Sequence, residues 1–88
     1  MNVKEYIEEF YPGEEIIIFD GLDDAFIGIG YQFNKALACY DREKIIDTLI
    51  KEGMTAEEAI EYHDFNIVGS YLGEGTPIII DSTKLESE

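Results

Sequence analysis

The first thirteen residues show a hydrophobic spacing that is typical of a short amphipathic helix. Val3, Ile7 and Phe10 recur at intervals of four and three, which places them on one face of a helix. Pro12 and Gly13 follow directly, and this pair ends helical segments because proline lacks a backbone N–H group and glycine favours turns. We therefore predict a short N-terminal helix that needs packing against the rest of the chain.

Four later segments have the composition of β-strands. Residues 15–20 are rich in isoleucine, and residues 25–33 carry an apolar side chain at every odd position, which indicates one packed face. The pair Asn34 and Lys35 predicts a tight turn into a third strand over residues 36–40. A run of three isoleucines, residues 78–80, predicts the fourth strand.

Small residues follow a regular pattern within two of these strands. Gly28 and Gly30 leave one side of the second strand almost without side chains, and Ala36 and Ala38 continue the pattern in the third. We predict that this strip lets a helix approach the sheet closely, in preference to forming a ligand cleft.

Two helices are predicted between the third and fourth strands. Asp41 is a suitable N-cap for a helix over residues 42–52, and Gly53 suits its closure. Thr55 and Glu58 have the spacing of a capping box, which predicts a second helix that ends near Gly69. The glutamates at the start of this helix thus have a structural explanation.

These elements predict a single α+β domain over residues 1–81, followed by a polar C-terminal tail over residues 82–88. We expect a short N-terminal helix and a mainly antiparallel four-stranded sheet. We also expect a helical hairpin between strands 3 and 4 that packs on one face of the sheet.

The charge of the chain excludes some classes of partner. Twenty acidic side chains against six basic ones give a net charge of −14. Direct binding to nucleic acid or to an anionic membrane is therefore disfavoured by electrostatic repulsion. Residues 5–24 carry eight acids and no base, and residues 52–81 carry seven acids and no base. This segregation favours association with a protein that has a basic surface.

The cellular compartment is indicated by cysteine usage and by the N-terminus. Cys39 is the only cysteine and lies among apolar residues, so we expect a buried, inert thiol in a reducing environment. The N-terminal residues lack the basic and then apolar pattern of a signal peptide. We expect the protein to act in the host cytoplasm.

Asp20, Asp23 and Asp24 are the most prominent candidates for chemistry. Carboxylates that converge from a strand end and a turn can hold a divalent cation, here with help from Glu74 or Asp81. The alternative is that aspartates occur in turns because they bond to the local backbone. We favour this alternative and expect no metal site and no cofactor.

No catalytic constellation is evident in the sequence. His63 and Asp64 are adjacent on a helix and therefore point about 100° apart, which does not make a catalytic dyad. The glycine pairs do not extend to a nucleotide-binding motif. We therefore expect no enzymatic activity and no catalytic residues.

A partner surface is instead predicted from exposed acids and aromatic side chains. Tyrosines flanked by acids suit protein interfaces because they offer an apolar ring and a polar hydroxyl group. The exposed edges of so small a sheet also suit a homodimer. The expected partner-binding residues are Glu14, Glu15, Asp20, Asp23, Asp24, Tyr31, Tyr62, Tyr71 and Glu74.

Four short motifs resemble a family of small, acidic phage and prophage proteins of uncharacterised function. They are GLDDA at residues 21–25, YD at residues 40–41, GMTAEEA at residues 53–59 and GSYLGEGTP at residues 69–77. The resemblance covers roughly residues 20–80 and brings no catalytic residue with it. It implies a mobile-element origin, in which small acidic proteins often occupy the nucleic-acid site of a host protein.

Three functional hypotheses follow. The first is a non-enzymatic binding protein that inhibits a host protein directed at nucleic acids, such as a defence nuclease, through an acidic surface or by mimicking nucleic acid, as in anti-CRISPR proteins. The second is an oligomeric protein that binds a small ligand or divalent metal through Asp20, Asp23 and Asp24. The third is a structural or virion accessory protein whose charge serves only solubility.

Overall fold

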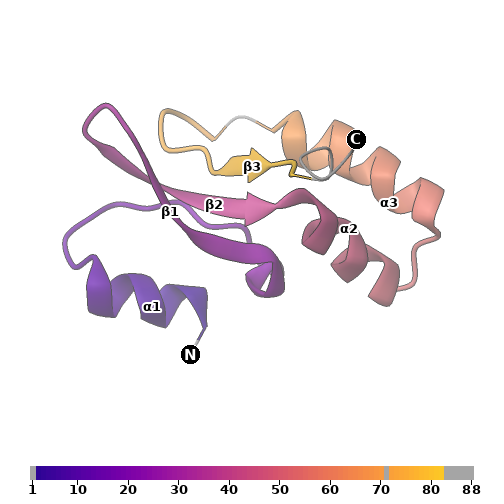
Figure 1. Cartoon of the computed structure of the whole chain (residues 1–88), viewed down its shortest axis with the longest axis horizontal. Coiled ribbons are helices and arrows are strands. Elements are labelled where there is room, and N and C mark those ends of the chain that lie inside the picture. Colours follow the sequence, from indigo (N-terminus) through magenta and orange to yellow (C-terminus); the bar gives the residue numbers. More distant parts are fainter. Residues whose placement is uncertain (1, 71, 83–88) are drawn as a thin grey trace.

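The computed structural model describes residues 2–70 and 72–82, and within this part the chain is an α+β domain (Figure 1). Its three α-helices and three strands are α1 (Val3–Phe10), β1 (Phe26–Gln32), β2 (Lys35–Asp41), α2 (Arg42–Lys51), α3 (Ala56–Tyr62) and β3 (Ile78–Ile80). A 3₁₀ turn, η1 (Asp23–Ala25), precedes β1, and a π-helical segment, η2 (His63–Val68), continues α3. The α+β class predicted from the sequence is thus confirmed, whereas most of the predicted tail lies outside the described residues.

The sheet is mixed and has three strands in the order β1-β2-β3, rather than four mainly antiparallel strands. β1 and β2 are antiparallel, but β3 runs parallel to β2. Parallel strands need a long crossover connection, and α2, α3 and η2 provide it. The predicted topology is therefore wrong, although residues 78–80 do form a strand.

The isoleucine-rich segment over residues 15–20 is not a strand. Residues 15–19 have no regular secondary structure, Asp20 lies in a turn, and none of them pairs with a strand of the sheet. The Phe19 N–H group donates a hydrogen bond of 2.9 Å to the Tyr40 hydroxyl oxygen, and Ile16 and Ile18 pack against the core. β-Branched residues suit any half-buried extended surface, so their abundance does not by itself specify backbone pairing.

The helical hairpin also departs from its predicted position. α2 begins directly after Asp41, the last residue of β2, and the Asp41 carboxylate accepts a hydrogen bond from the Lys44 N–H group. With no loop between strand and helix, the chain cannot fold back over the sheet. Figure 1 accordingly shows α2 and α3 beyond the ends of the strands, rather than stacked on one face.

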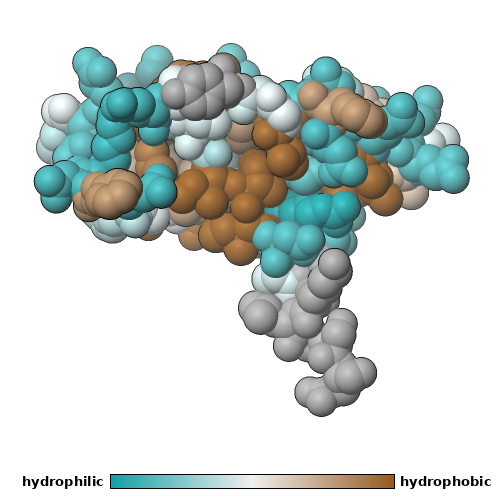
Figure 2. Space-filling model, turned by 90° about the horizontal axis from the view of Figure 1, so that it is seen from above, coloured by the Kyte–Doolittle hydropathy of each residue, from teal (hydrophilic) through white to brown (hydrophobic). Residues whose placement is uncertain are grey.

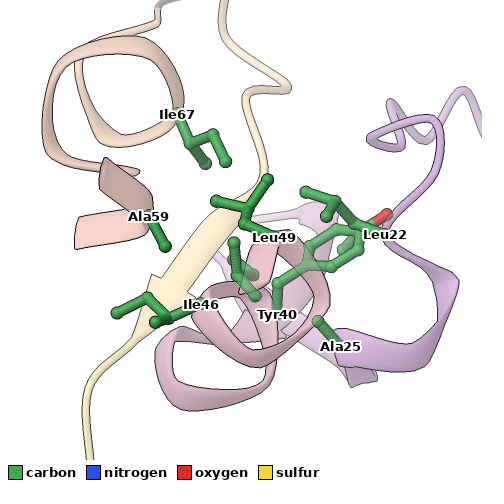
Figure 3. Packing of buried hydrophobic residues seen from close by; sticks show 9 residues of the cluster. Leu22, Ala25, Tyr40, Ile46, Leu49, Ala59 and Ile67 are labelled. Carbon is green, nitrogen blue, oxygen red and sulfur yellow. The ribbon is translucent and has the colours of Figure 1, made fainter. Parts of the chain in front are cut away.

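The hydrophobic core lies where the sheet, η1 and the helices meet, and Tyr40 is at its centre (Figure 3). Its side chain is 0% exposed, and its ring is 5.1 Å from that of Phe19 and 5.7 Å from that of Phe26, between centroids. Leu22 and Ala25 approach it from the η1 side, and α2 contributes three residues. The buried cluster comprises Leu22, Ala25, Ala38, Tyr40, Ile45, Ile46, Leu49, Ala59 and Ile67.

Helix caps form as predicted from the sequence. The Thr55 hydroxyl oxygen accepts from the Glu58 N–H group at 3.1 Å, and the Glu58 carboxylate accepts from the Thr55 N–H group at 2.9 Å. The same reciprocal pair also forms between Asn2 and Glu5 at the start of α1. α1 itself ends just before Pro12 and Gly13, as expected.

The β1-β2 hairpin turns one residue earlier than predicted. Gln32 pairs with Lys35, so Phe33 and Asn34 form the two-residue loop. Phe33 has a φ angle of 56°, in the left-handed region that favours glycine. A phenylalanine at this position is not a turn signal, which explains why the sequence pattern extended the strand through it.

The small residues of the sheet do not form a single strip that receives a helix. Gly28 and Gly30 pair with Cys39 and Leu37, which places them on one face of the sheet. The alanines of β2 pair with Tyr31 and Ile29 and therefore lie on the other face. A Cβ atom added to Gly30 would lie 2.8 Å from the Cys39 Sγ atom, so a cysteine on the neighbouring strand, not a helix, requires this glycine.

β3 forms one edge of the sheet. It pairs with β2 on one side, and no strand within residues 2–70 and 72–82 pairs with its other side. Figure 2 views the molecule from above Figure 1, which is the side on which β3 lies. Hydrophobic side chains gather at the middle of this face. Ile78 and Ile79 are half-buried, and Ile80 is exposed at the end of the strand.

Replacement of Tyr40 by phenylalanine tests the contact that anchors residues 14–19. Tyr40→Phe leaves the part-buried Phe19 N–H group without its acceptor, and we expect a loss of about 2 kcal/mol in the free energy of unfolding, measured by urea denaturation.

Burial raises the pKa of Tyr40 above its ordinary value of 10.0, against the opposing effect of the Phe19 hydrogen bond. The wild type should therefore lose stability as the pH rises above 10, because the unfolded state ionises first, and Tyr40→Phe should lose less. Equal alkaline losses would contradict this assignment.

Replacement of Gly30 by alanine tests the close approach of Cys39. The added methyl group must displace the Sγ atom, and we expect Gly30→Ala to lower the free energy of unfolding by about 1–3 kcal/mol. The double variant Gly30→Ala with Cys39→Ala provides the control, because it removes the sulfur atom. A cost of Gly30→Ala that is the same in both backgrounds would show that the contact is not the cause.

Candidate functional site

The aspartate turn before β1 is held by two buried apolar residues. The Ala25 N–H group donates a hydrogen bond of 2.9 Å to the Leu22 carbonyl oxygen, which closes the 3₁₀ turn η1. Leu22 and Ala25 both point into the core. The residues beside them, Asp20, Asp23 and Asp24, are exposed. The local sequence thus anchors the turn on its apolar side and presents three carboxylates to solvent.

Asp23 also has a structural contact with α1. Its Oδ2 atom accepts a hydrogen bond of 3.3 Å from the Val3 N–H group, the first in the helix. A carboxylate at a helix N-terminus is stabilised by the free N–H groups and by the helix dipole. Nearby, the ring of Tyr6 meets that of Phe26 at 5.7 Å between centroids. These two contacts fix α1 beside the aspartate turn.

The three aspartates line a shallow cavity of about 420 Å³, in which Lys4 is the one basic lining residue. Asp20 also lines an adjoining cavity of about 260 Å³, together with Glu52 and Tyr62. Tyr62 then lines a third cavity of about 480 Å³ with Glu58, Glu61, Met54, Phe65 and Asn66. Neighbouring cavities share lining residues, because Asp20 and Gly21 line the first two and Tyr62 and Asn66 line the second and third. We call their acidic lining residues and Tyr62 the acidic surface: Asp20, Asp23, Asp24, Glu52, Glu58, Glu61 and Tyr62.

The other residues expected at a partner surface lie elsewhere. Glu14, Glu15 and Glu74 are exposed but line none of these three cavities. Tyr31 is 69% exposed near the tip of the β1-β2 hairpin, whereas Tyr62 is 42% exposed. Tyr71 lies outside the described residues. The expected set is thus divided between the acidic surface and separate exposed positions.

Carboxylates of the acidic surface do not converge as metal ligands do. Within residues 2–70 and 72–82, no group of three histidine, cysteine, aspartate or glutamate side chains could hold a metal ion. Asp81 lies with Arg42 instead, at 4.0 Å between Oδ2 and Nε. The spacing of the carboxylates suits contact with several separate cations better than coordination of one ion.

His63 is the one buried polar or charged residue in the described part of the chain. Its side chain is 1% exposed, and its Nδ1 atom lies 3.2 Å from the Asp64 Oδ1 atom. This contact was not expected from the sequence, because adjacent residues of an α-helix point about 100° apart. Both residues belong to η2, which is π-helical. The Nε2 atom is buried without a hydrogen-bond partner in the described part of the chain. The ring is therefore enclosed by the core.

Cys39 is buried, as expected. Burial raises the pKa of its thiol above the ordinary value of 9.0, with a smaller opposing effect from the Gly30 backbone. A raised pKa keeps the sulfur protonated near neutral pH and therefore a poor nucleophile. The structural position of Cys39 gives the thiol no reactive character.

Sequence reasoning did not assign Glu52, Glu58 and Glu61 to a site. It explained the glutamates at the start of α3 by capping and by the helix dipole, and Glu58 does complete the capping box. The spacing of residues 58, 61, 62 and 65 places them on one helix face, and this was the available signal. This face carries acidic and aromatic side chains together. The buried residues of α3 and η2, which are Ala59, His63 and Ile67, belong to a different face.

Comparison with known proteins adds no assignment. No protein-family model matches the chain, and neither a curated protein nor a solved structure shows significant similarity to it. Within residues 2–70 and 72–82, no helix has the length and apolar character needed to cross a membrane.

The contact between Asp23 and α1 separates the structural from the surface aspartates. Asp23→Ala removes the acceptor of the Val3 N–H group, and we expect a loss of about 1 kcal/mol in the free energy of unfolding. Asp24→Ala is the matched control, because Asp24 accepts no hydrogen bond within the described residues and should stay within about 0.5 kcal/mol of the wild type. Urea denaturation of both variants measures the difference. Equal effects would show that the helix contact does not stabilise the domain.

Proposed function

We propose that this chain is a non-enzymatic binding protein that inhibits a host protein directed at nucleic acids by covering its basic surface. The observation that supports this most directly is the acidic surface, where three adjoining cavities present six carboxylates and one lysine. A protein that binds nucleic acid carries a complementary arrangement of lysine and arginine side chains. An inhibitor that presents spaced carboxylates to those side chains competes with phosphate groups.

The physical basis of recognition is charge complementarity over an extended surface. The net charge of −14 attracts a basic partner before contact, which raises the association rate. In contact, the carboxylates of the acidic surface meet separate cations, each partly exposed to solvent. Such pairs contribute modestly one by one and weaken with salt because solvent ions screen them. The proposed complex is therefore strongly salt-dependent.

Tyr62 adds a contact that charge alone does not supply. It is shared by two of the cavities, and Phe65 and Met54 lie in the lining beside it. Aromatic side chains at the centre of an interface contribute more to affinity than the charged rim, because they bury apolar area with little loss of conformational entropy. The surface thus combines an apolar centre with acidic surroundings, which suits the aliphatic stems and charged ends of lysine and arginine.

Two further expectations stay proposals. The outer edge of β3, which pairs with no strand among the described residues, suits a homodimer in which two edge strands pair. Sedimentation of the purified chain measures this directly. The host cytoplasm is the proposed place of action, because a defence protein directed at nucleic acids works there.

Neutralising the acidic surface tests the proposed function. We expect the variant with Asp20→Asn, Asp24→Asn, Glu52→Gln and Glu61→Gln to bind its host partner at least about tenfold more weakly at low salt. The affinity of this variant should also depend less on salt. The partner is first captured from host lysate at two salt concentrations. The captured protein is then titrated with each variant and with the nucleic acid that the captured protein binds.

A control with the same change in net charge separates a local surface from a general effect. Glu8→Gln, Glu9→Gln, Asp47→Asn and Glu57→Gln alter four exposed acids that line none of the three cavities. This control should retain most of the affinity. The proposal is wrong if both fourfold variants bind equally well, or if the wild type captures no basic protein at either salt concentration.

A further inference from the structure

The tip of the β1-β2 hairpin carries a phenylalanine in a conformation that suits glycine. Phe33 has a φ angle of 56°, and among the described residues it is the one non-glycine with positive φ. Two-residue hairpin loops with positive φ only at the first position favour glycine there, because a side chain crowds the backbone. A bulky side chain in this region is strained relative to glycine.

The Phe33 side chain receives nothing from the fold in return. It is 96% exposed, so almost the whole ring is in contact with solvent. Tyr31, two residues earlier on β1, is also 69% exposed. An exposed aromatic ring contributes no burial to folding stability. The local structure would thus be more stable with glycine at position 33, and the presence of phenylalanine needs another explanation.

The charge around the hairpin differs from that of the rest of the chain. Residues 25–40 carry no acidic side chain, and Lys35 is the one charged residue among them. The tip also lies at the opposite end of the molecule from α3 (Figure 1). An apolar element without carboxylates can enter a dry pocket and bury no unpaired charge. The two loop residues, Phe33 and Asn34, meet this condition, and the charged Lys35 beside them is exposed and can stay at the rim in water, whereas the acidic surface does not meet it.

We propose that Phe33 is an aromatic anchor that inserts into an apolar pocket on the partner protein, with Tyr31 packing at the rim. This inference rests on one part of the proposed function, which is that the chain binds another protein. It does not depend on the acidic surface. A lipid bilayer is a weaker occupant, because a chain of charge −14 is repelled by anionic headgroups. A second copy is also a weaker occupant, because contact through a hairpin tip alone buries less area than a stable dimer needs.

The first arm of the test needs no partner. Phe33→Gly should raise the melting temperature by several degrees, because it relieves the strained φ angle and removes no buried contact. Asn34→Gly is the matched control, since Asn34 occupies the same turn without a positive φ. This control should leave the melting temperature unchanged or lower it. A Phe33→Gly variant that is no more stable than the wild type would show that Phe33 serves the fold, and would overturn the proposal.

The second arm measures binding to the captured partner. Phe33→Gly should weaken the affinity at least about tenfold, by the same factor at low and moderate salt, because the lost contact is apolar. Asn34→Gly should bind as the wild type does. A photoreactive phenylalanine analogue at position 33 should cross-link to a partner segment flanked by apolar residues. An unchanged affinity of Phe33→Gly, or a cross-link to a charged segment, would overturn the anchor.

The remaining outcomes separate this inference from the proposed function. If the acidic-surface variant loses salt dependence but Phe33→Gly binds normally, only the anchor is wrong. If the wild type captures no protein, both are wrong. Flotation with zwitterionic and anionic vesicles and sedimentation of the free chain complete the test. Binding to vesicles, or self-association, that Phe33→Gly abolishes would assign the ring to that occupant and overturn the proposed pocket.

Discussion

The hydrogen bond from the Phe19 N–H group to the buried Tyr40 hydroxyl oxygen is the contact on which the arrangement of the domain depends. It ties residues 14–19, which have no regular secondary structure and no strand partner, to the centre of the core. The next residue along the chain is Asp20, and the turn η1 follows. Tyr40 thus helps to position the three aspartates. The hydrogen bond of Asp23 to the Val3 N–H group in turn positions α1. The buried hydroxyl group, together with the side chains of Leu22 and Ala25, thus links the core to the candidate site.

The features that were predicted correctly from the sequence are the helix caps and helix starts, which local interactions determine. The capping box of Thr55 and Glu58 formed with both hydrogen bonds, and α2 begins at its predicted cap, Asp41. These contacts lie within four residues along the chain, so the sequence specifies them directly. The strand predicted over residues 15–20 failed for the opposite reason. Its contacts are with distant residues, and composition indicates an extended backbone without indicating whether another strand pairs with it.

The candidate site was predictable in part, for the same reason. Asp20, Asp23 and Asp24 were identified because they interrupt an apolar pattern, and they do lie along one cavity. Glu52 was missed because it lies 28 residues after Asp24 in the sequence, and the packing of η1 against α2 brings it near the turn. Phe33 was missed because a bulky residue at positive φ contradicts turn statistics, and such conflicts between local preference and structure are expected at functional positions.

The separation of the two surfaces constrains what a partner can be. The acidic surface takes its residues from η1, α3 and the segments beside them, and the hairpin tip lies at the opposite end of the molecule from α3 (Figure 1). Charge complementarity acts at long range and is screened by salt, whereas insertion of one ring acts only at contact and is not screened. A partner that uses both must be large enough to extend along the chain, with a basic surface and an apolar pocket some distance apart. Charge would then govern how fast such a complex forms, and the ring would govern how long it lasts.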